Sequence, residues 1–148
     1  MKIVHIAVAV AVALTLAGVS AAASSSRGAS VGTTRTALGR IAVDAQGRSL
    51  YLFEIDKRGH SACSGLCTSY WPPLITKGKP VALAGIKRSL LGTIRRSDGR
   101  LQVTLAGHPL YRFSGDSKRG QTTGEGLQDF GGGWDVLTPS GKKIEGGG

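Results

Sequence analysis

The residues with the clearest chemical potential are two cysteines and a histidine that lie close together in the chain. Cys63 and Cys67 are separated by three residues, and His60 precedes Cys63 by three. Thiolates and imidazole bind thiophilic ions, so this set could hold copper(I) or act as a redox dithiol. The same spacing suits a disulfide, because two cysteines on a turn or a single helical turn can approach within bridging distance. The three residues alone leave both interpretations open.

The amino-terminal segment favours the disulfide, because it has the layout of a secretory signal peptide. Lys2 precedes an uncharged, mostly apolar run over residues 3–18, and Ala21 to Ala23 supply small residues for cleavage. A single membrane anchor is the alternative, but the run is shorter than the roughly 20 residues that span a bilayer. We therefore expect residues 1–23 to be a cleaved signal peptide. Two lone cysteines in an oxidising compartment are then expected to form a bridge.

The rest of the sequence gives little support for catalysis. It contains no His-Glu-x-x-His segment and no pair of carboxylates in a recognisable setting. His108, the other histidine of the mature chain, lies between Gly107 and Pro109, where packing within a turn is the simpler role. The sequence therefore predicts a protein that is not an enzyme and needs no cofactor, with copper as the alternative cofactor.

The chain is strongly basic, with 19 lysines and arginines, nine acidic residues and a net charge of +10. Two basic pairs, Lys57-Arg58 and Lys118-Arg119, occupy similar places in the two halves of the chain. A basic face attracts anionic polymers or lipid head groups over long range, although such charges also serve solubility alone. Basic residues are not interleaved with aromatic ones, which argues against sequence-specific nucleic-acid binding. We expect a monomer.

The two halves are alike because the sequence repeats at an offset of 60 residues. Gly39 to Asp56 overlays Gly99 to Asp116 with eight of eighteen positions identical, and Trp71 and Trp134 follow the copies at nearly equal distances. One supersecondary unit is therefore used twice. Short alternating apolar runs between glycines predict a mainly β domain of two related hairpin units, with seven or eight short strands. The sequence leaves open whether the units share one sheet.

Composition sets the expected boundaries of this domain. Residues 24–36 are rich in Ser, Thr, Gly and Arg, which predicts a flexible tether. The two-repeat domain should cover residues 37–144, with units at about 37–74 and 91–138, and residues 145–148 should form a disordered tail. Only the stretch from Ala62 to Tyr70 favours a helical turn, which would form a loop pinned by the disulfide.

Each unit carries a short aromatic motif that ends in aspartate. The motif residues are Tyr51, Phe53 and Asp56 in the first unit, and Tyr111, Phe113 and Asp116 in the second. The tyrosine and the phenylalanine are two residues apart, so a strand points them to the same side. We expect each tyrosine to pack in the core with the phenylalanine of its own unit and one tryptophan. An aspartate at a strand end is expected to accept hydrogen bonds from the turn that follows.

These segments resemble a family of bacterial secreted repeats and lipoproteins that carries the motif Tyr-x-(Phe/Trp/Tyr)-x-x-Asp. The resemblance also rests on Cys63 to Cys67 followed by Trp71-Pro72-Pro73-Leu74, on Gly107 to Tyr111 and on Gly133-Trp134. It implies an extracytoplasmic, envelope- or surface-associated protein without an established activity. Many members carry a lipid-attachment cysteine after the signal, which this chain lacks. We therefore expect a soluble exported protein that binds an anionic partner or supports the cell boundary.

Overall fold

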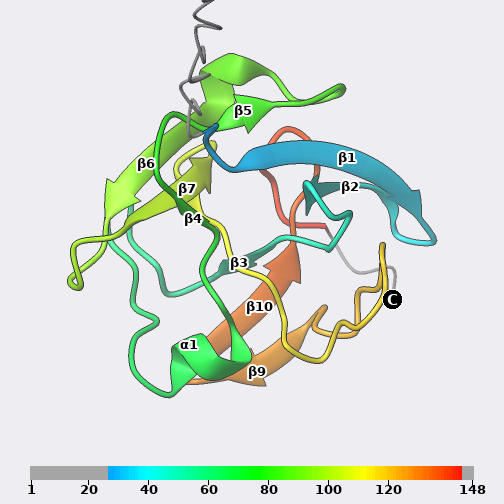
Figure 1. Cartoon of the computed structure of the whole chain (residues 1–148). Helices are drawn as coiled ribbons and strands as arrows, with labels where there is room; N and C mark the ends of the chain where they lie inside the picture. The colour runs from blue at the N-terminus through cyan, green and yellow to red at the C-terminus, as the bar shows by residue number, and fades with distance from the viewer. Residues whose placement is uncertain (1–26, 145–148) are drawn as a thin grey trace, which may run out of the picture.

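The computed structural model describes residues 27–144 (Figure 1). These residues contain ten short strands, one turn of α-helix and one 3-10 turn, joined by loops. The predicted signal segment 1–23 and the predicted tail 145–148 lie outside them. In chain order the elements are β1 (Ser30–Thr36), β2 (Gly39–Asp44), β3 (Tyr51–Phe53), α1 (Cys67–Tyr70), β4 (Ile75–Thr76), β5 (Val81–Ala82), η1 (Arg88–Leu90), β6 (Leu91–Arg95), β7 (Leu101–Leu105), β8 (His108–Pro109), β9 (Leu127–Asp129) and β10 (Gly132–Val136).

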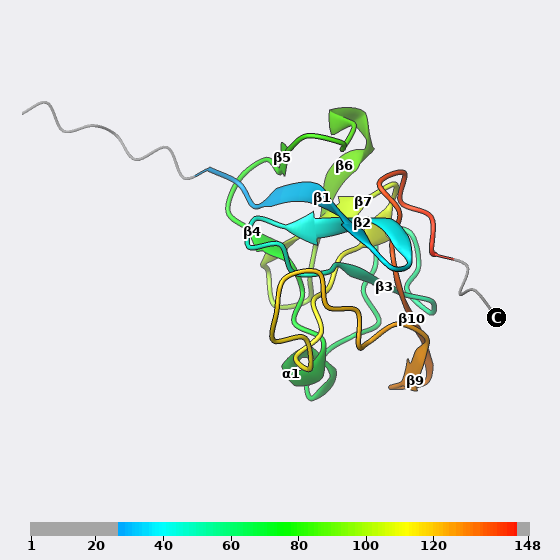
Figure 2. The same cartoon turned by 90° about the vertical axis from the view of Figure 1, so that its right-hand side faces the viewer.

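The strands form three small sheets, which confirms the mainly β prediction with ten strands in place of seven or eight. One sheet has the order β2-β1-β5, the second β4-β7-β6 with β8 paired to β7, and the third β3-β10-β9. The equivalent hairpins β1–β2 and β6–β7 therefore lie in separate sheets. By contrast, β3 of the first copy pairs with β10 of the second, with Phe53 opposite Trp134. Figures 1 and 2 both place β9 and α1 at the end of the domain opposite β5.

The predicted flexible tether, residues 24–36, is wrong for its last seven residues. Ser30–Thr36 form β1, which pairs antiparallel with β2 from Val31 opposite Asp44 to Thr36 opposite Gly39. Val31 is fully buried. Composition hid this strand because Val31 is its only large apolar residue, and its order comes from the backbone ladder to β2 rather than from apolar burial.

The repeat consequently begins earlier than Gly39, where the overlay of the two halves of the sequence started. At the same offset of 60 residues, the strand sequence Val-Gly-Thr-Thr-Arg-Thr at 31–36 overlays Leu-Gly-Thr-Ile-Arg-Arg at 91–96. These segments are β1 and the strand β6 with the residue that follows it. Each copy therefore starts with a hairpin whose first strand carries a Gly-Thr pair and an exposed arginine.

The core has an aromatic part and an aliphatic part. Tyr51 and Leu52 are neighbours on β3, and they face different parts because successive side chains of a strand point to opposite sides. The aromatic part also contains both tryptophans, and the aliphatic part contains Leu50, Leu74, Leu105, Leu110 and Leu137. Among residues 27–144, no helix is long and apolar enough to cross a membrane.

Candidate functional site

The motif tyrosines and aspartates form hydrogen bonds across the two copies. The Tyr51 hydroxyl donates to Oδ2 of Asp116 over 2.6 Å, and the Tyr111 hydroxyl donates to Oδ2 of Asp56 over 2.7 Å. The backbones of the two tyrosines also bond to each other in both directions, over 2.8 and 3.0 Å. The two copies are thus related by an approximate twofold axis that passes between Tyr51 and Tyr111.

Each motif aspartate also holds the loop that follows it, as the sequence predicted. Oδ1 of Asp56 accepts the Ala62 N–H over 2.6 Å, and Oδ1 of Asp116 accepts the Thr123 N–H over 2.9 Å. Burial raises the pKa of Asp56, and the Ala62 amide and the Tyr111 hydroxyl oppose that rise. Burial, reinforced by the partner aspartates, raises the pKa of both Tyr51 and Tyr111 far above the usual value. These polar groups satisfy one another, so the motif builds the fold.

The aromatic rings cross between the copies as well. Trp71 and Trp134 stack with their centroids 3.9 Å apart and their planes within 5°. Phe53 stacks on Trp134 at 4.0 Å, Phe113 lies 4.4 Å from Trp71, and Tyr51 contacts Phe113 at 6.3 Å. The expectation that each tyrosine packs with the phenylalanine of its own copy is therefore wrong. The reason is the strand pairing, because β10 places Trp134 directly opposite Phe53.

The cysteine loop contains the predicted disulfide. Cys63 and Cys67 are bonded through their sulfurs, with their Cα atoms 5.4 Å apart, and both are buried. His60 lies on the exposed start of the loop, where its backbone pairs with Lys57. Sulfurs that are bonded to each other offer no thiolate, so the copper alternative would require the reduced protein. Within residues 27–144, no three His, Cys, Asp or Glu side chains are grouped as a metal centre would need.

Arg96 anchors this loop, and the sequence analysis missed it. Its buried guanidinium donates to the Cys63 carbonyl over 2.7 Å, to Oε1 of Gln102 over 2.6 Å and to the Ser61 hydroxyl over 3.0 Å. Strand alternation could have identified the position, because Arg96 is two residues beyond buried Ile94 and so faces the same side. An arginine on a buried side needs partners of this kind.

The basic pairs that follow the motifs occupy equivalent positions, each beside the hairpin of the other copy. The Arg119 guanidinium lies against Gly47, where an added Cβ would be 2.9 Å from it. Arg58 lies in the same way over Gly107, with Nε 3.5 Å from the corresponding point. Both glycines have positive φ, near +80°, so the turn conformation and the close approach both favour glycine. Beside Arg58, burial and then the arginine charge lower the pKa of His108.

These basic side chains have no counter-charge of their own in the described part of the chain. The ion pairs among residues 27–144 involve Arg96, Arg100, Arg112 and Lys143. Lys57, Arg58, Lys118 and Arg119 take part in none of these pairs, and their side chains donate no hydrogen bond to residues 27–144. Their charges are therefore available to a partner.

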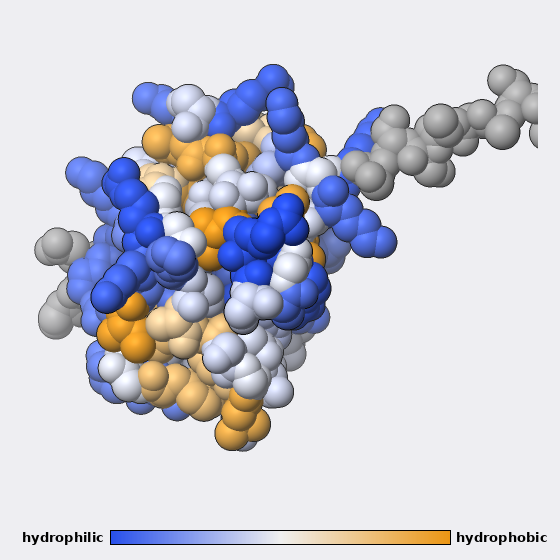
Figure 3. All heavy atoms as spheres, turned by 90° about the vertical axis from the view of Figure 1, so that its left-hand side faces the viewer, coloured by the Kyte–Doolittle hydropathy of each residue, from blue (hydrophilic) through white to orange (hydrophobic). Residues whose placement is uncertain are grey.

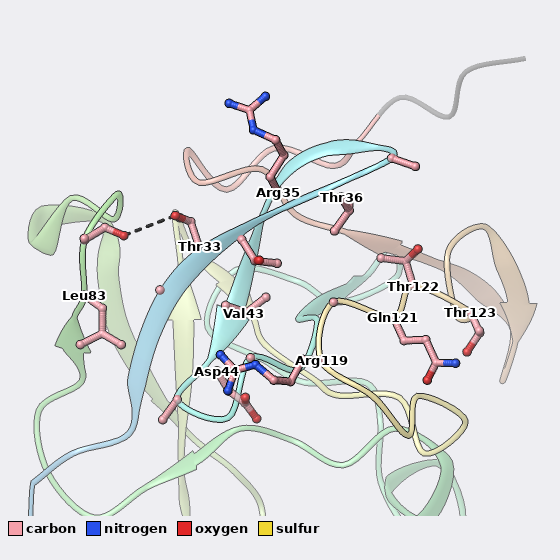
Figure 4. A pocket seen from close by; sticks show the side chains of 17 residues that line it. Thr33, Arg35, Thr36, Val43, Asp44, Leu83, Arg119, Gln121, Thr122 and Thr123 are labelled. Carbon is pink, nitrogen blue, oxygen red and sulfur yellow. Dashed lines mark hydrogen bonds between the residues drawn. The ribbon is translucent and has the colours of Figure 1, made fainter.

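A cleft of about 720 Å³ lies beside Arg119. We call it the β1 cleft: β1 and the following residue, 32–37, form one wall, and residues 119–123 form the other. Figure 4 shows Thr33 and Leu83 on one side and Gln121 and Thr122 on the other, with Arg119 between them. Arg35 points away from Arg119 in this view. The sequence analysis missed the cleft because it treated β1 as a flexible tether.

Comparison with known proteins places both copies in one family. The model of the family Lipoprotein_15, described as a secreted repeat of unknown function, matches residues 32–75 and 92–138. No curated protein and no solved structure matches the chain. The two matched segments begin within β1 and β6, in agreement with the longer repeat that the structure shows.

Proposed function

Since the chain belongs to this family of secreted repeats, we propose that it acts outside the cytoplasm as a non-catalytic, envelope-associated protein that binds an anionic polymer. The family description supports the secreted location. The non-catalytic role is supported by the motif, because its hydroxyls and carboxylates bond to one another and to backbone amides.

The observation that carries the proposal is the placement of the two basic pairs. Lys57-Arg58 and Lys118-Arg119 lie at equivalent points of the twofold arrangement, each beside a hairpin turn of the other copy. Side chains with this charge and no internal partner attract anions over distances of about 10 Å in dilute salt. Two such rims on one domain suit a ligand that repeats its charge, because both rims can then be occupied by one molecule.

The rest of the surface agrees with this proposal. Figure 3 shows clusters of hydrophilic side chains on the face that carries β6, with apolar atoms between these clusters and at the lower end. The acidic side chains are mostly used within the fold: Asp98 pairs with Arg100, and Asp44 lies 3.7 Å from Arg112. Little negative charge is therefore left to oppose an anionic ligand.

The proposal is tested with poly(glycerol phosphate) and poly-γ-glutamate as probes, by calorimetric titration of the mature protein at several salt concentrations. We expect binding whose dissociation constant rises steeply with salt, because each contact is between exposed charges. The variant K57Q/R58Q/K118Q/R119Q should lose at least tenfold in affinity. Its matched control is K77Q/K79Q/K87Q/R88Q, which removes the same charge from elsewhere and should lose far less.

Three outcomes would contradict the proposal. Equal losses in the two variants would mean that net charge alone attracts the probes. Absence of binding to both polymers at low salt would remove the polymer as a ligand. Binding to vesicles of anionic phospholipid without binding to either polymer would transfer the role to lipid head groups.

A further inference from the structure

The two copies contain corresponding clefts of unequal size. The β1 cleft lies between β1 and the segment Lys-Arg-Gly-Gln-Thr at 118–122. Its counterpart lies between β6 and the segment Lys-Arg-Gly-His-Ser at 57–61, and it is lined by His60, Ser61, Cys63, Ser64, Arg95, Arg96 and Ser97. We call it the β6 cleft. Its volume is about 360 Å³, half that of the β1 cleft.

One substitution between the copies accounts for much of this difference. Arg96 corresponds to Thr36 because the two are 60 positions apart, Thr36 at the end of β1 and Arg96 directly after β6. In the β6 cleft the Arg96 side chain crosses to the opposite wall, where it bonds to Ser61 and to the Cys63 carbonyl. The short Thr36 side chain instead bonds within its own turn, donating to the Gly39 carbonyl and accepting from the Leu38 N–H. The β1 cleft is therefore left unfilled.

The polar side chains discussed here that face the β1 cleft can all donate hydrogen bonds. The Arg119 guanidinium and the Thr34 and Thr122 hydroxyls form no hydrogen bond with residues 27–144. Gln121 is held by its Oε1, which accepts the N–H groups of Ser117 and Lys118, so its amide NH₂ remains to donate. This arrangement suits a ligand that is rich in acceptors.

The one carboxylate of the cleft does not reverse this preference. Oδ1 of Asp44 accepts the N–H groups of Gln46 and Arg48. Its buried Oδ2 has no hydrogen-bond partner among the described residues, but it forms an ion pair with Nη1 of Arg112 over 3.7 Å. Asp44 thus serves its own hairpin turn and a neighbouring arginine. With Arg119 free and Asp44 engaged, the cleft favours an anionic group.

We infer that the β1 cleft is a binding site for a single phosphate- or carboxylate-bearing unit, held by Arg119 with Gln121 and Thr122. The inference rests on the proposed polymer binding and deepens it. Both basic rims attract the polymer, but Arg119 lines the larger cleft, whereas Arg58 does not line the β6 cleft. A volume of about 720 Å³ lies within the range of small-molecule sites. Binding should therefore be asymmetric, with one enclosed unit per chain.

The test is an NMR titration of isotopically labelled mature protein with two monomeric probes, glycerol 3-phosphate and glucuronate. Amide shifts should concentrate at residues 32–37 and 119–123, and whichever probe binds tighter identifies phosphate or carboxylate as the preferred group. R119Q should weaken binding at least tenfold. The matched change R58Q, in the equivalent rim, removes a side chain that does not line the β6 cleft, so it should change affinity less than twofold.

The decisive variant is T36R, which copies Arg96 into the β1 cleft. It adds a positive charge, so binding that depended only on charge would become tighter, whereas binding inside the cleft should be lost. A thermal melt shows whether T36R is folded. R119Q also tests whether the probe binds in the β1 cleft, and it leaves the turn after β1 unchanged. The inference is overturned if T36R is folded and binds as tightly as the wild type, or if R58Q and R119Q weaken binding equally. If the wild type binds neither polymer, the proposed function is overturned instead.

Discussion

The hydroxyl of Tyr51 and the carboxylate of Asp116 lie 2.6 Å apart in the core, although 65 residues separate them in the chain. The bond joins the first copy of the repeat to the second, and Tyr111 and Asp56 make the same bond in the other direction. A motif that is local in sequence therefore acts through contacts that are not local at all. Its aspartates are fixed at both oxygens, by a tyrosine of the other copy and by the amide of their own loop.

Replacing Tyr51 by phenylalanine should destabilise the protein by about 1–3 kcal/mol, because a buried carboxylate oxygen loses its donor. The free energy of unfolding from urea titration measures this loss, and a double-mutant cycle with D116N should show that the two side chains are coupled. Y70F is the control, since the Tyr70 side chain is half exposed and should contribute less than about 0.5 kcal/mol. A Y51F protein as stable as Y70F would contradict the importance of the bond.

In an alkaline titration of the folded protein, Tyr51 and Tyr111 should ionise late. Tyrosines of an unfolded chain release their protons near pH 10, whereas burial and the aspartate neighbours raise the pKa of Tyr51 and Tyr111. The folded state then binds more protons than the unfolded state above about pH 10, so the free energy of unfolding should fall as the pH rises. Tyrosinate absorbance should gain two equivalents only on unfolding, and one in Y51F. Gradual ionisation of Tyr51 and Tyr111 near pH 10 in the folded protein would refute this prediction.

Removing the Phe53 ring should be more damaging than removing an apolar side chain two residues later. Phe53 is buried and stacked on Trp134, so F53A should cost about 3–5 kcal/mol. Ile55 is 44% exposed, and I55A should cost less than about 1 kcal/mol. Thermal unfolding of the two variants measures the difference. Similar melting temperatures would mean that the stacked ring contributes little.

Much of this fold follows from the sequence, because its signals are local. Alternating apolar runs between glycine turns form strands, as at β2, β6 and β7, and the short helix α1 lies within the predicted stretch from Ala62 to Tyr70. The disulfide follows from two lone cysteines in an exported chain. What could not be predicted depends on pairing between distant segments: β1 is ordered by its ladder to β2, and Phe53 finds its partner through β10.

The candidate site was predictable only in part, for the same reason. The sequence indicated the basic pairs, but it gave no sign that Arg58 and Arg119 would lie beside the hairpins of opposite copies. Comparing Thr36 with Arg96 requires that residues 31–36 be recognised as a strand. Once they are, the difference between the larger and the smaller cleft can be read from one aligned position.

The cysteine loop should be stabilised only modestly by its disulfide. Changing both Cys63 and Cys67 to serine should cost about 2 kcal/mol or less, because the closed ring is short. Arg96 should matter more than the disulfide, since R96M would leave the Cys63 carbonyl and the Gln102 side chain without their donor. Denaturant titration of both variants shows which one loses more unfolding free energy. A greater loss in the double serine variant would contradict it.

The copper alternative makes a separate and opposite prediction for the same residues. Our proposed function predicts that reduced wild type and the C63S/C67S variant bind copper(I) equally weakly in an anaerobic calorimetric titration. A metal site would instead give tight one-to-one binding that the double variant loses and H60A weakens. Copper(I) would then also raise the melting temperature of reduced wild type.

The position of Arg58 can be tested through its neighbour His108. Burial and the Arg58 charge hold the pKa of His108 below its usual value, so the R58Q variant should raise that pKa in an NMR titration, whereas K118Q should leave it in place. The folded state binds fewer protons than the unfolded state near pH 6.5 and just below, so stability should fall as the pH drops through that range. If the pKa of His108 is the same in R58Q as in the wild type, Arg58 does not lie beside His108.

The crossed bonds between Tyr51 and Asp116 and between Tyr111 and Asp56 have the form of a homodimer interface written into a single polypeptide. A chain that carried one copy alone could satisfy its tyrosine and its aspartate only by associating with a second chain, residue for residue, about a twofold axis. Joining the two halves covalently removes the need for them to be identical. One half has a disulfide and an arginine that spans its cleft, and the other has a threonine at that position and a larger cleft beside it.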